Sequence, residues 1–369
     1  MSNLTADIPS TSRAALFRGP GQQLNLVDAS IPPVESGEVL VRIDCCTMCG
    51  SDLHTINGTR VEPTPSVLGH EVVGTVCSLG ETPAKDINAE VLQQGDRVTW
   101  SPAVSCGSCD RCLDGLPQKC RELFKYGHAI ANGRDTLSGG LAEYILLRRG
   151  SAIIKLQTDD PVEVFAPASC AAATAAAAIR EASEVADTNL LIFGAGMLGL
   201  TAAAMAKTFG AKRVTVCDPD PNRLERAADF GADRVVQWRD SESELWRQLH
   251  GDTSDSNINV ILELSGAVKA VEAALWCGDI GARIVLVGSV MDSPPAQFDP
   301  TSLVRKCLSV RGVHNYTPPD LATAVGFLQQ HHAAFPFAKL VERTFPLSEI
   351  NEAVEFAHSQ RPIRIAIQP

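Results

Sequence analysis

The chain has 369 residues, of which 45% are hydrophobic and 20% charged, and its formal net charge is −11. This length and composition predict two globular domains with ordinary buried cores. A chain this acidic is not expected to bind nucleic acid or an anionic membrane as its main role, although one local cluster of Arg and Lys is enough to bind a small anionic substrate.

The start of the chain lacks a charged segment followed by an apolar core, so no secretory signal is predicted. The apolar stretch 171–179 is too short to span a bilayer. We therefore expect a cytoplasmic protein with reduced thiols. Six cysteines outside the motifs below are expected to be small core residues: Cys45, Cys46, Cys77, Cys217, Cys277 and Cys307.

The pattern of elements changes along the chain. The first 150 residues are rich in Gly, Pro and short β-type runs such as 38–45 and 70–79, which predicts a mainly β domain. From about residue 160, strand patterns at 189–193, 213–218, 259–264 and 283–288 alternate with helix patterns at 197–209, 221–230 and 268–276. This alternation predicts an α/β domain with a parallel, doubly wound sheet. After about residue 304 the pattern is mixed.

Four cysteines lie close together at spacings of three, three and eight residues: Cys106, Cys109, Cys112 and Cys120. Thiolates on one tight loop can converge on a metal ion at about 2.3 Å, and four sulfurs leave no position for a substrate. The spacing therefore predicts a structural zinc site. A pair of disulfides fits poorly with a cytoplasmic chain.

The run 194–199, GAGMLG, follows an apolar strand and begins a helix, which is the context of a dinucleotide-binding GxGxxG motif. Gly194 allows the tight turn, Gly196 lets the pyrophosphate approach the backbone, and Gly199 permits close packing of helix and strand. Met197 and Leu198 complete the motif at the N-terminus of the helix, where free N–H groups and the helix dipole favour phosphate.

Asp218 ends the second strand of this region, nineteen residues after Gly199. A carboxylate at this position hydrogen-bonds the ribose hydroxyls and repels a 2′-phosphate, which favours NAD over NADP. Arg223 follows five residues later and is placed to lie beside the adenosine ribose. An arginine there can also accept a 2′-phosphate, so the strictness of the NAD preference stays open.

Two further motifs identify a family when they are read with the cofactor fold and the four-cysteine loop. The runs CGSDLH at 49–54 and GHExxGxxxxxG at 69–80 resemble those of the zinc-dependent medium-chain alcohol dehydrogenases, and the resemblance covers nearly the whole chain. It implies an enzyme with two zinc ions per chain and NAD as cofactor, which transfers hydride between NAD and a small alcohol, aldehyde or ketone.

The resemblance makes Cys49, His70 and Cys170 the ligands of a catalytic zinc. Some relatives of this kind use a Glu in place of the third ligand, and Glu163 is the nearest upstream carboxylate, so that choice stays open. Glu71 can act as a fourth or exchanging ligand. Three protein ligands and one open position would let zinc bind an alcohol oxygen and stabilise its alkoxide.

By the same resemblance, Ser51 accepts the proton of the substrate and His54 passes it to solvent, as suits a group with an ordinary pKa near 6.5. Asp52 is expected to orient His70 by a hydrogen bond. Without the metal motifs, Ser51 and His54 would read as a capped helix start with a surface histidine.

The resemblance also implies the fold. A β-rich GroES-like catalytic domain over 1–168 and 305–369 is expected to hold both zinc sites, and a Rossmann domain over 169–304 to bind NAD. The active site is expected in the cleft between them. A homodimer or homotetramer is implied, with the apolar stretch 283–290 able to pair across a two-fold axis.

The substrate is the least determined feature. The strings at 116–128 and 312–316 resemble a bacterial subgroup associated with phosphonate catabolism, which implies a hydroxyalkyl phosphonate bound by Lys125, Arg121 or Arg134. Polyols, amino alcohols such as threonine, and simple primary alcohols stay open. Trp100 is expected either to line the substrate pocket or to lie in the core.

Two other readings compete with a dehydrogenase. A zinc-free quinone reductase of the same superfamily conflicts with the four-cysteine loop and with the predicted catalytic ligands. A non-catalytic NAD-binding sensor on the same fold has no need of a proton relay.

Overall fold

The computed structural model describes residues 8–157, 159, 161–239, 241–250 and 257–369. Residues 1–7 belong to the segment in which a secretory signal was considered, and they lie outside the described part. The chain forms two compact units. Unit 1 comprises Met1–Cys170, Thr317–Gln329 and Phe337–Pro369, and unit 2 comprises Ala171–Tyr316 and Gln330–Pro336. The predicted domain boundaries after residues 168 and 304 stay predictions.

Unit 1 is built on a seven-stranded sheet in the order β10-β6-β5-β3-β18-β17, with β9 paired to β3. Two small sheets, β2-β1-β4 and β7-β8, accompany it. The strands are β1 (Thr11–Phe17), β2 (Asn25–Ser30), β3 (Val39–Thr47), β4 (Ser66–Val67), β5 (Glu71–Leu79), β6 (Arg97–Trp100), β7 (Ala103–Val104), β8 (Phe124–Lys125), β9 (Tyr144–Leu147), β10 (Ile153–Lys155), β17 (Val341–Pro346) and β18 (Arg364–Gln368).

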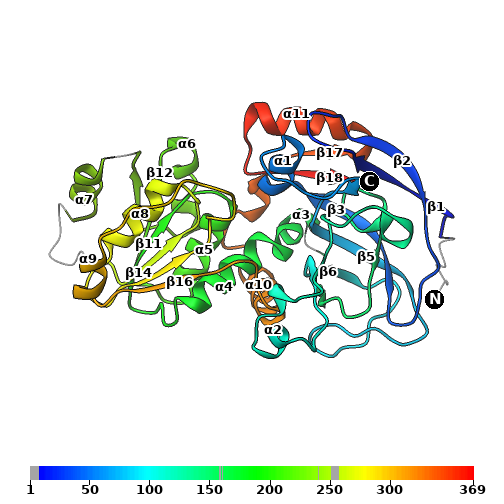
Figure 1. Cartoon of the computed structure of the whole chain (residues 1–369), viewed down its shortest axis with the longest axis horizontal. Coiled ribbons are helices and arrows are strands. Elements are labelled where there is room, and N and C mark those ends of the chain that lie inside the picture. The colour runs from blue at the N-terminus through cyan, green and yellow to red at the C-terminus, as the bar shows by residue number, and fades with distance from the viewer. Residues whose placement is uncertain (1–7, 158, 160, 240, 251–256) are drawn as a thin grey trace. The chain divides into compact units, whose positions relative to one another are not determined.

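The end of the chain returns to this sheet. Strand β18 pairs antiparallel with β3, at Ala366 opposite Thr47, and parallel with β17. Figure 1 shows these last strands, in red, beside the blue β3. The helices that lie wholly in unit 1 are α1 (Gly50–Ile56), α2 (Asp110–Leu113), α3 (Val162–Phe165) and α11 (Ile350–Gln360), and α10 (Pro318–His331) begins there.

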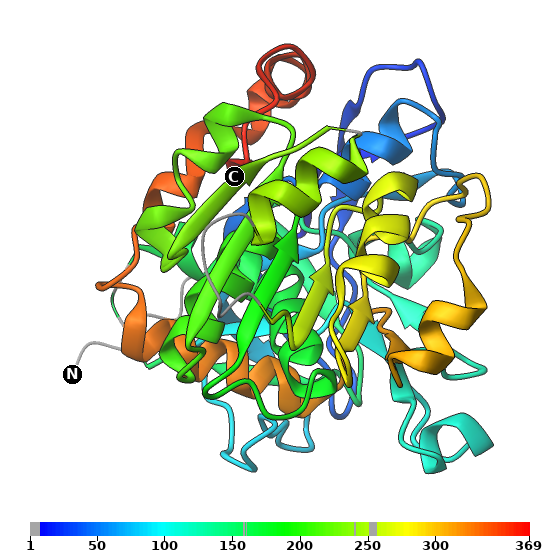
Figure 2. The ribbon, with the colours of Figure 1, turned by 90° about the vertical axis from the view of Figure 1, so that its left-hand side faces the viewer.

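Unit 2 holds a six-stranded parallel sheet in the order β13-β12-β11-β14-β15-β16 (Figures 1 and 2). In chain order this is 3-2-1-4-5-6, the order of a Rossmann domain, and it reverses between β11 and β14. The strands are β11 (Asn189–Phe193), β12 (Arg213–Asp218), β13 (Arg234–Gln237), β14 (Val260–Glu263), β15 (Arg283–Leu286) and β16 (Ser309–Gly312). The helices are α4 (Ala171–Glu181), α5 (Met197–Thr208), α6 (Pro221–Leu224), α7 (Glu242–His250), α8 (Val268–Cys277) and α9 (Pro300–Arg305).

The predicted fold class, a GroES-like β domain with a Rossmann domain, is confirmed. Two details differ. The helix expected over 221–230 ends at Leu224, and a 3₁₀ turn at Ala228–Phe230 follows. The apolar stretch at 283–290 contains β15, an inner strand, because β16 pairs outside it. Strand β16 is the edge strand, and it is exposed along its whole length. Its residues, 309–312, therefore need no apolar run.

The free cysteines divide by environment. Cys45, Cys46, Cys217 and Cys277 are buried as expected, and Cys77 is half-buried. Cys307 is exposed, so the expectation of a core residue is wrong there.

Among the described helices, none is by itself long and apolar enough to cross a membrane. One pair that bends by 53° at its junction, Val162–Ser169 with Ala171–Glu181, meets the length and composition only when taken together.

Gly199 marks the closest approach between α5 and β11. A Cβ atom at Gly199 would lie 1.7 Å from the carbonyl oxygen of Gly194, whereas a Cβ at Gly196 would meet none of the described atoms within 4 Å. Packing therefore requires a glycine at position 199. It does not require one at position 196, where the absence of a side chain leaves room beside the helix N-terminus.

We predict that Gly199→Ala lowers the stability of unit 2 by about 1–3 kcal/mol or more, because the backbone of the glycine turn must move. Urea unfolding followed by circular dichroism would measure this, with Gly196→Ala as the matched control that should unfold near the parent midpoint. Equal midpoints for all three proteins would contradict the packing argument.

Candidate functional site: two cysteine-based metal centres and a glycine turn

The four-cysteine loop forms a ready metal site. The sulfurs of Cys106, Cys109, Cys112 and Cys120 all lie within 4.8 Å of one another. Cys109 Sγ is 3.5 Å from Cys112 Sγ and 3.9 Å from Cys120 Sγ. A tetrahedral site with Zn–S bonds of about 2.3 Å has sulfur–sulfur edges of about 3.8 Å, so these residues fit zinc.

Backbone groups prepare the loop for thiolates. The N–H of Cys109 donates to Cys106 Sγ at 3.4 Å, and the N–H of Glu122 donates to Cys120 Sγ at 3.3 Å. Hydrogen bonds from Ser108 and Cys109 lower the pKa of Cys106 to about 6. Arg121 closes the loop by a bidentate ion pair with Asp110, both distances being 2.6 Å.

A second group of donors consists of Cys49, His70 and Cys170, whose ligand atoms also lie within 4.8 Å of one another. They come from three segments. Cys49 is the N-cap of α1, two residues after the end of β3, and His70 immediately precedes β5. Cys170 follows the 3₁₀ turn Ala166–Ser169, and Ser169 Oγ donates to the carbonyl of His70 at 3.1 Å. Two sulfurs and one imidazole suit zinc and leave one tetrahedral position for a substrate.

Asp52 links two of these donors. Its Oδ2 accepts from the N–H of Cys49 at 2.9 Å, and its Oδ1 accepts from the N–H of Gly69 at 3.3 Å. The same Oδ1 lies 3.3 Å from His70 Nδ1, an ion-pair distance without hydrogen-bond alignment. A carboxylate beside Nδ1 directs Nε2 to the metal, as is common around zinc-bound histidines.

Glu71 is fully buried beside the second group, and its carboxylate is held by an arginine from the far end of the chain. Arg364 donates to both oxygens, each at 2.8 Å, and Thr47 Oγ1 donates to Oε2 at 2.6 Å. Burial raises the pKa of Glu71, and the charge of Arg364 opposes that rise. Arg364 Nη2 also lies 3.6 Å from Cys49 Sγ, so one guanidinium faces both a carboxylate and a metal donor.

The sequence alone does not identify Arg364 as a site residue, because no local motif marks it. It lies 293 residues after Glu71, and only the pairing of β18 with β3 brings the two segments together. The sequence did hold one signal for it. A carboxylate next to a buried metal ligand, as Glu71 is next to His70, requires a cation nearby. Glu163 accepts from Gln368 at 3.2 Å and is not in the donor group, so the open choice of third ligand falls to Cys170.

Ser51 and His54 both lie on α1. Ser51 Oγ is 3.5 Å from His70 Nε2, which places the hydroxyl at the edge of the donor group. His54 is exposed, and its Nδ1 lies 2.9 Å from Thr59 Oγ1. The helix thus carries one polar group beside the donors and another at the surface.

The glycine turn lies at the carboxyl end of β11, next to the reversal of strand order. Gly194 has φ +103°, and Gly196 is the N-cap of α5, with Met197 and Leu198 in its first turn. Asp218 is 5% exposed at the end of β12, and its Oδ2 accepts from the N–H of Ala195 at 2.7 Å.

The other oxygen of Asp218 accepts from the N–H of Asp220 at 2.9 Å. Arg223 is half-exposed, with Nε 3.9 Å from Asp220 Oδ2. The carboxylate of Asp218 is thus fixed directly beside the glycine turn, and Arg223 lies one helical turn beyond it.

The candidates for substrate contact separate clearly. Arg134 is paired with Glu38 and with Glu35, and Arg121 with Asp110, so both cations already have carboxylate partners. Trp100 is 2% exposed and belongs to the core of unit 1, which decides between its two expected locations. Lys125, the third cation, has no carboxylate within ion-pair distance among the described residues.

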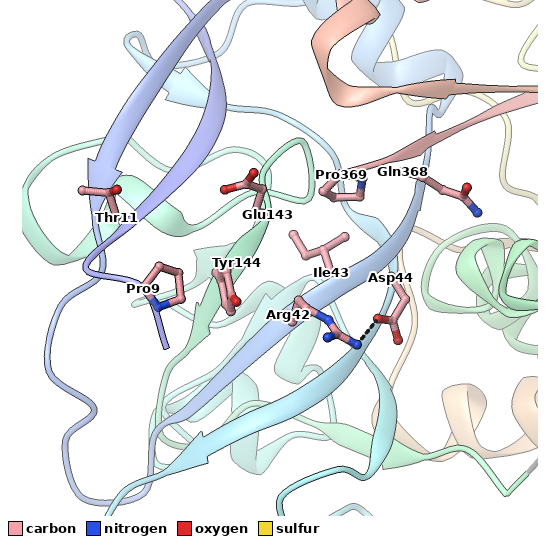
Figure 3. A pocket seen from close by; sticks show the side chains of 9 residues that line it. All are labelled: Pro9, Thr11, Arg42, Ile43, Asp44, Glu143, Tyr144, Gln368 and Pro369. Atoms are coloured by element: carbon pink, nitrogen blue, oxygen red, sulfur yellow. Dashed lines mark hydrogen bonds and ion pairs between the residues drawn. The ribbon is translucent and has the colours of Figure 1, made fainter. Parts of the chain in front are cut away.

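A separate depression of about 710 Å³ lies elsewhere on unit 1 (Figure 3). Its lining includes Arg42, Asp44 and Tyr144, and Arg42 pairs with Asp44 at 3.4 Å. None of the predicted site residues lines it, so it does not belong to either donor group.

Comparison with known proteins agrees with this geometry. Residues 35–158 match the model of the alcohol dehydrogenase GroES-like domain, and residues 198–330 match that of the zinc-binding dehydrogenases. The chain is 31% identical over 310 residues to an L-threonine 3-dehydrogenase of Paraburkholderia phytofirmans, covering 82% of each chain. It is 25% identical to D-arabinitol dehydrogenase 1 of Uromyces fabae, covering 99% of each. The crystal structure of an alcohol dehydrogenase from Thermotoga maritima superimposes with a TM-score of 0.92 at 28% identity, covering 97% of this chain and 99% of that one.

The chain belongs to the zinc-dependent medium-chain alcohol dehydrogenase family. It is a zinc-containing, NAD(P)-dependent oxidoreductase that acts on a CH–OH group, with one structural Cys₄ zinc site and one catalytic Cys–His–Cys zinc site. This outcome goes against both the zinc-free reductase and the non-catalytic sensor.

We predict that Cys109→Ser and Cys49→Ser each hold about one zinc ion fewer per chain than the parent, whose two donor groups account for two. Only Cys109→Ser should lower the melting temperature by roughly 5 °C or more, because the metal of the Cys₄ site would tie together both ends of the loop from Cys106 to Cys120. Metal analysis and thermal melting would check both variants.

Cys307→Ser is the matched control, since Cys307 is exposed and outside both groups. It should keep both ions and the parent melting temperature. A large loss of stability in Cys49→Ser with none in Cys109→Ser would mean that the two roles are exchanged.

Proposed function

We propose that the chain transfers hydride between NAD and a small polar alcohol or its carbonyl product. The observation that carries this proposal is the three-donor group of Cys49, His70 and Cys170 with the Ser51 hydroxyl at its edge, 3.5 Å from His70 Nε2. A metal centre with one position left for substrate, beside a group that can take a proton, is what alcohol oxidation requires.

In this proposal the three donors hold zinc, which when bound supplies the Lewis acidity that lowers the pKa of the alcohol hydroxyl. Ser51 accepts the hydroxyl proton at Oγ and gives up its own proton, which passes on toward His54. His54 releases a proton to solvent from the exposed end of the same helix. Asp52 keeps His70 in the orientation that leaves Nε2 for the metal.

Glu71 is proposed as an exchanging fourth ligand. Arg364 holds both carboxylate oxygens in the structure, so this role would require Glu71 to exchange those two hydrogen bonds for the metal. Arg364 Nη2 also lies 3.6 Å from Cys49 Sγ, so its positive charge lies beside both groups.

For the coenzyme, we propose that Gly194, Gly196 and Gly199, with Met197 and Leu198, form the pyrophosphate turn. Asp218 would hydrogen-bond the adenosine ribose and disfavour a 2′-phosphate, with Arg223 beside it. The room at Gly196, where a Cβ would meet no described atom within 4 Å, supports a close approach of phosphate to the backbone.

The substrate is proposed to be a hydroxyalkyl phosphonate, with a polyol or an amino alcohol as the second candidate. Support for the second comes from two relatives that are named for threonine and arabinitol. Support for the first comes from Lys125, the one of the three candidate cations without a carboxylate partner among the described residues.

The remaining parts of the proposal concern the whole protein. We propose a GroES-like catalytic domain over 1–168 and 305–369, a coenzyme domain over 169–304, a cytoplasmic location and a homodimer or homotetramer. The exposed edge strand β16 supports an oligomer, because an unpaired edge offers backbone groups to a second copy.

We predict that the zinc-loaded protein forms NADH with one class of alcohols in a panel of hydroxyalkyl phosphonates, polyols, threonine and primary alcohols. The rate should fall to background when a chelator removes zinc from the Cys–His–Cys site, and return when zinc is added. Absorbance at the NADH band measures this. Turnover that is unaffected in Cys49→Ser would overturn the proposal.

We predict that Asp218→Asn lowers the ratio of kcat/KM for NAD over NADP by about tenfold or more, since the repulsive charge is lost. The amide keeps one oxygen that can accept from the N–H of Ala195. Steady-state kinetics with both coenzymes would test this. An unchanged ratio would show that Asp218 does not select the coenzyme.

A further inference from the structure

The segment Phe124–His128 lies against a catalytic metal ligand. A Cβ at Gly127 would meet the carbonyl oxygen of Gly69 at 2.6 Å and His70 Cβ at 3.2 Å, so the two backbones are in close contact. The ring of His128 lies 5.1 Å from that of His70. Side chains on this segment therefore belong to the immediate surroundings of the catalytic donor group.

The direction of Lys125 follows from its neighbours. Phe124 and Tyr126 contact each other edge-to-face at 5.2 Å, and Tyr126 is 1% exposed, with its hydroxyl 2.7 Å from Ser151 Oγ. Successive side chains of an extended strand point to opposite faces, so Lys125 points away from this core. Burial lowers the pKa of Lys125, and among the charges that act on it are those of Arg60, Glu62 and Cys170.

The charges around Lys125 do not balance. Glu62 is the carboxylate of the group; it is paired with Arg60 and acts on Lys125 from beyond ion-pair distance. Arg60 Nη2 lies 2.6 Å from Glu62 Oε1, and His128 Nδ1 lies 3.3 Å from the same oxygen. Among the described residues, no carboxylate lies within ion-pair distance of the Lys125 ammonium. A half-buried ammonium without a partner is costly unless a ligand supplies the anion.

His128 gives a second sign that a ligand binds here. Its side chain is 9% exposed, and Nδ1 makes no aligned hydrogen bond with any described residue, although Glu62 is close. A buried polar atom of this kind usually has a partner when the site is filled. Lys125 and His128, next to the catalytic donor group, can thus both donate a hydrogen bond to a bound anion.

We propose that Lys125, with His128, forms an anion subsite that selects alcohols carrying an oxyanion group, such as a carboxylate, phosphate or phosphonate. This inference rests on the proposed function, because it places the hydroxyl of the same molecule at the Cys49–His70–Cys170 centre. Lys125 is the specificity-determining residue.

The test uses matched alcohols on the zinc-loaded protein with NAD. The charged probes are 2-hydroxyethylphosphonate, glycerol 3-phosphate and 3-hydroxybutyrate, which also separate the three kinds of oxyanion, and their neutral counterparts are 1-propanol, glycerol and 1,3-butanediol. In Lys125→Met, we expect KM for the preferred charged alcohol to rise tenfold or more, with kcat/KM for its neutral counterpart unchanged within about twofold. Lys125→Arg should recover part of the loss.

Lys85→Met is the matched control, because Lys85 is an exposed lysine of the same unit. It should leave both substrates unaffected. Equal losses on charged and neutral alcohols in Lys125→Met, or no loss on either, would overturn the subsite. Zinc-dependent turnover of neutral alcohols alone by the parent would also overturn it, while the proposed function would stand.

A second measurement keeps the two proposals apart if no alcohol is turned over. Methylphosphonate, which has no hydroxyl to oxidise, should bind the zinc-loaded parent in calorimetric titration, and Lys125→Met should weaken that binding tenfold or more. Binding that is absent, or equal in the two proteins, would refute the subsite. Weakened binding without any turnover would support the subsite and count against the proposed oxidation.

Discussion

The catalytic donor group depends on one buried ion pair. Glu71 is fully buried, and it directly follows a metal ligand and lies beside two cysteines that bind metal as thiolates. Without a counter-charge, this concentration of negative charge would be costly in the interior. Arg364 supplies the counter-charge with two hydrogen bonds of 2.8 Å. Since Arg364 stands on β18, the chain must leave unit 1, build the six-stranded sheet, and return to place its last strand between β3 and β17. The order of the central sheet is thus tied to the electrostatics of the site.

A single carboxylate, that of Asp52, holds the other side of the donor group in place. Asp52 accepts from the N–H of Cys49 and lies beside His70 Nδ1, so it fixes one thiolate and one imidazole together. Both contacts come from backbone or from rigid rings, which leaves little freedom for the donors to move apart. Metal affinity and ligand orientation therefore rest on residues that never touch the metal. Gly69, whose N–H also binds Asp52, joins this arrangement to Gly127 and so to the segment that carries Lys125.

Local patterns predicted the parts of the protein that local chemistry determines. The spacing from Cys106 to Cys120 was sufficient for the structural zinc site, because one loop carries all four donors. Asp218 could be placed because it is the last residue of a recognisable strand. Contacts that depend on the return of the chain could not be read in this way, and Arg364 is the clearest case. The exposed strand β16 was missed because its sequence, SVRG, lacks the apolar run of an inner strand. In the sequence only their charge marks Arg121 and Arg134 as candidates, and the structure reveals the carboxylates that neutralise them.

The reaction is easier to infer than the substrate for a related physical reason. The donors of the metal sites are fixed by strands, loops and hydrogen bonds that any substrate would require. Selection among alcohols depends instead on which polar groups near the metal lack partners, and this is a property of the whole charge balance. Around Lys125 the carboxylate of Glu62 is paired with Arg60, and among the described residues no carboxylate lies within ion-pair distance of the ammonium. A neutral polyol would leave that imbalance in place, whereas an anionic alcohol would remove it on binding. The unpaired charge therefore carries more information about the substrate than the metal ligands do.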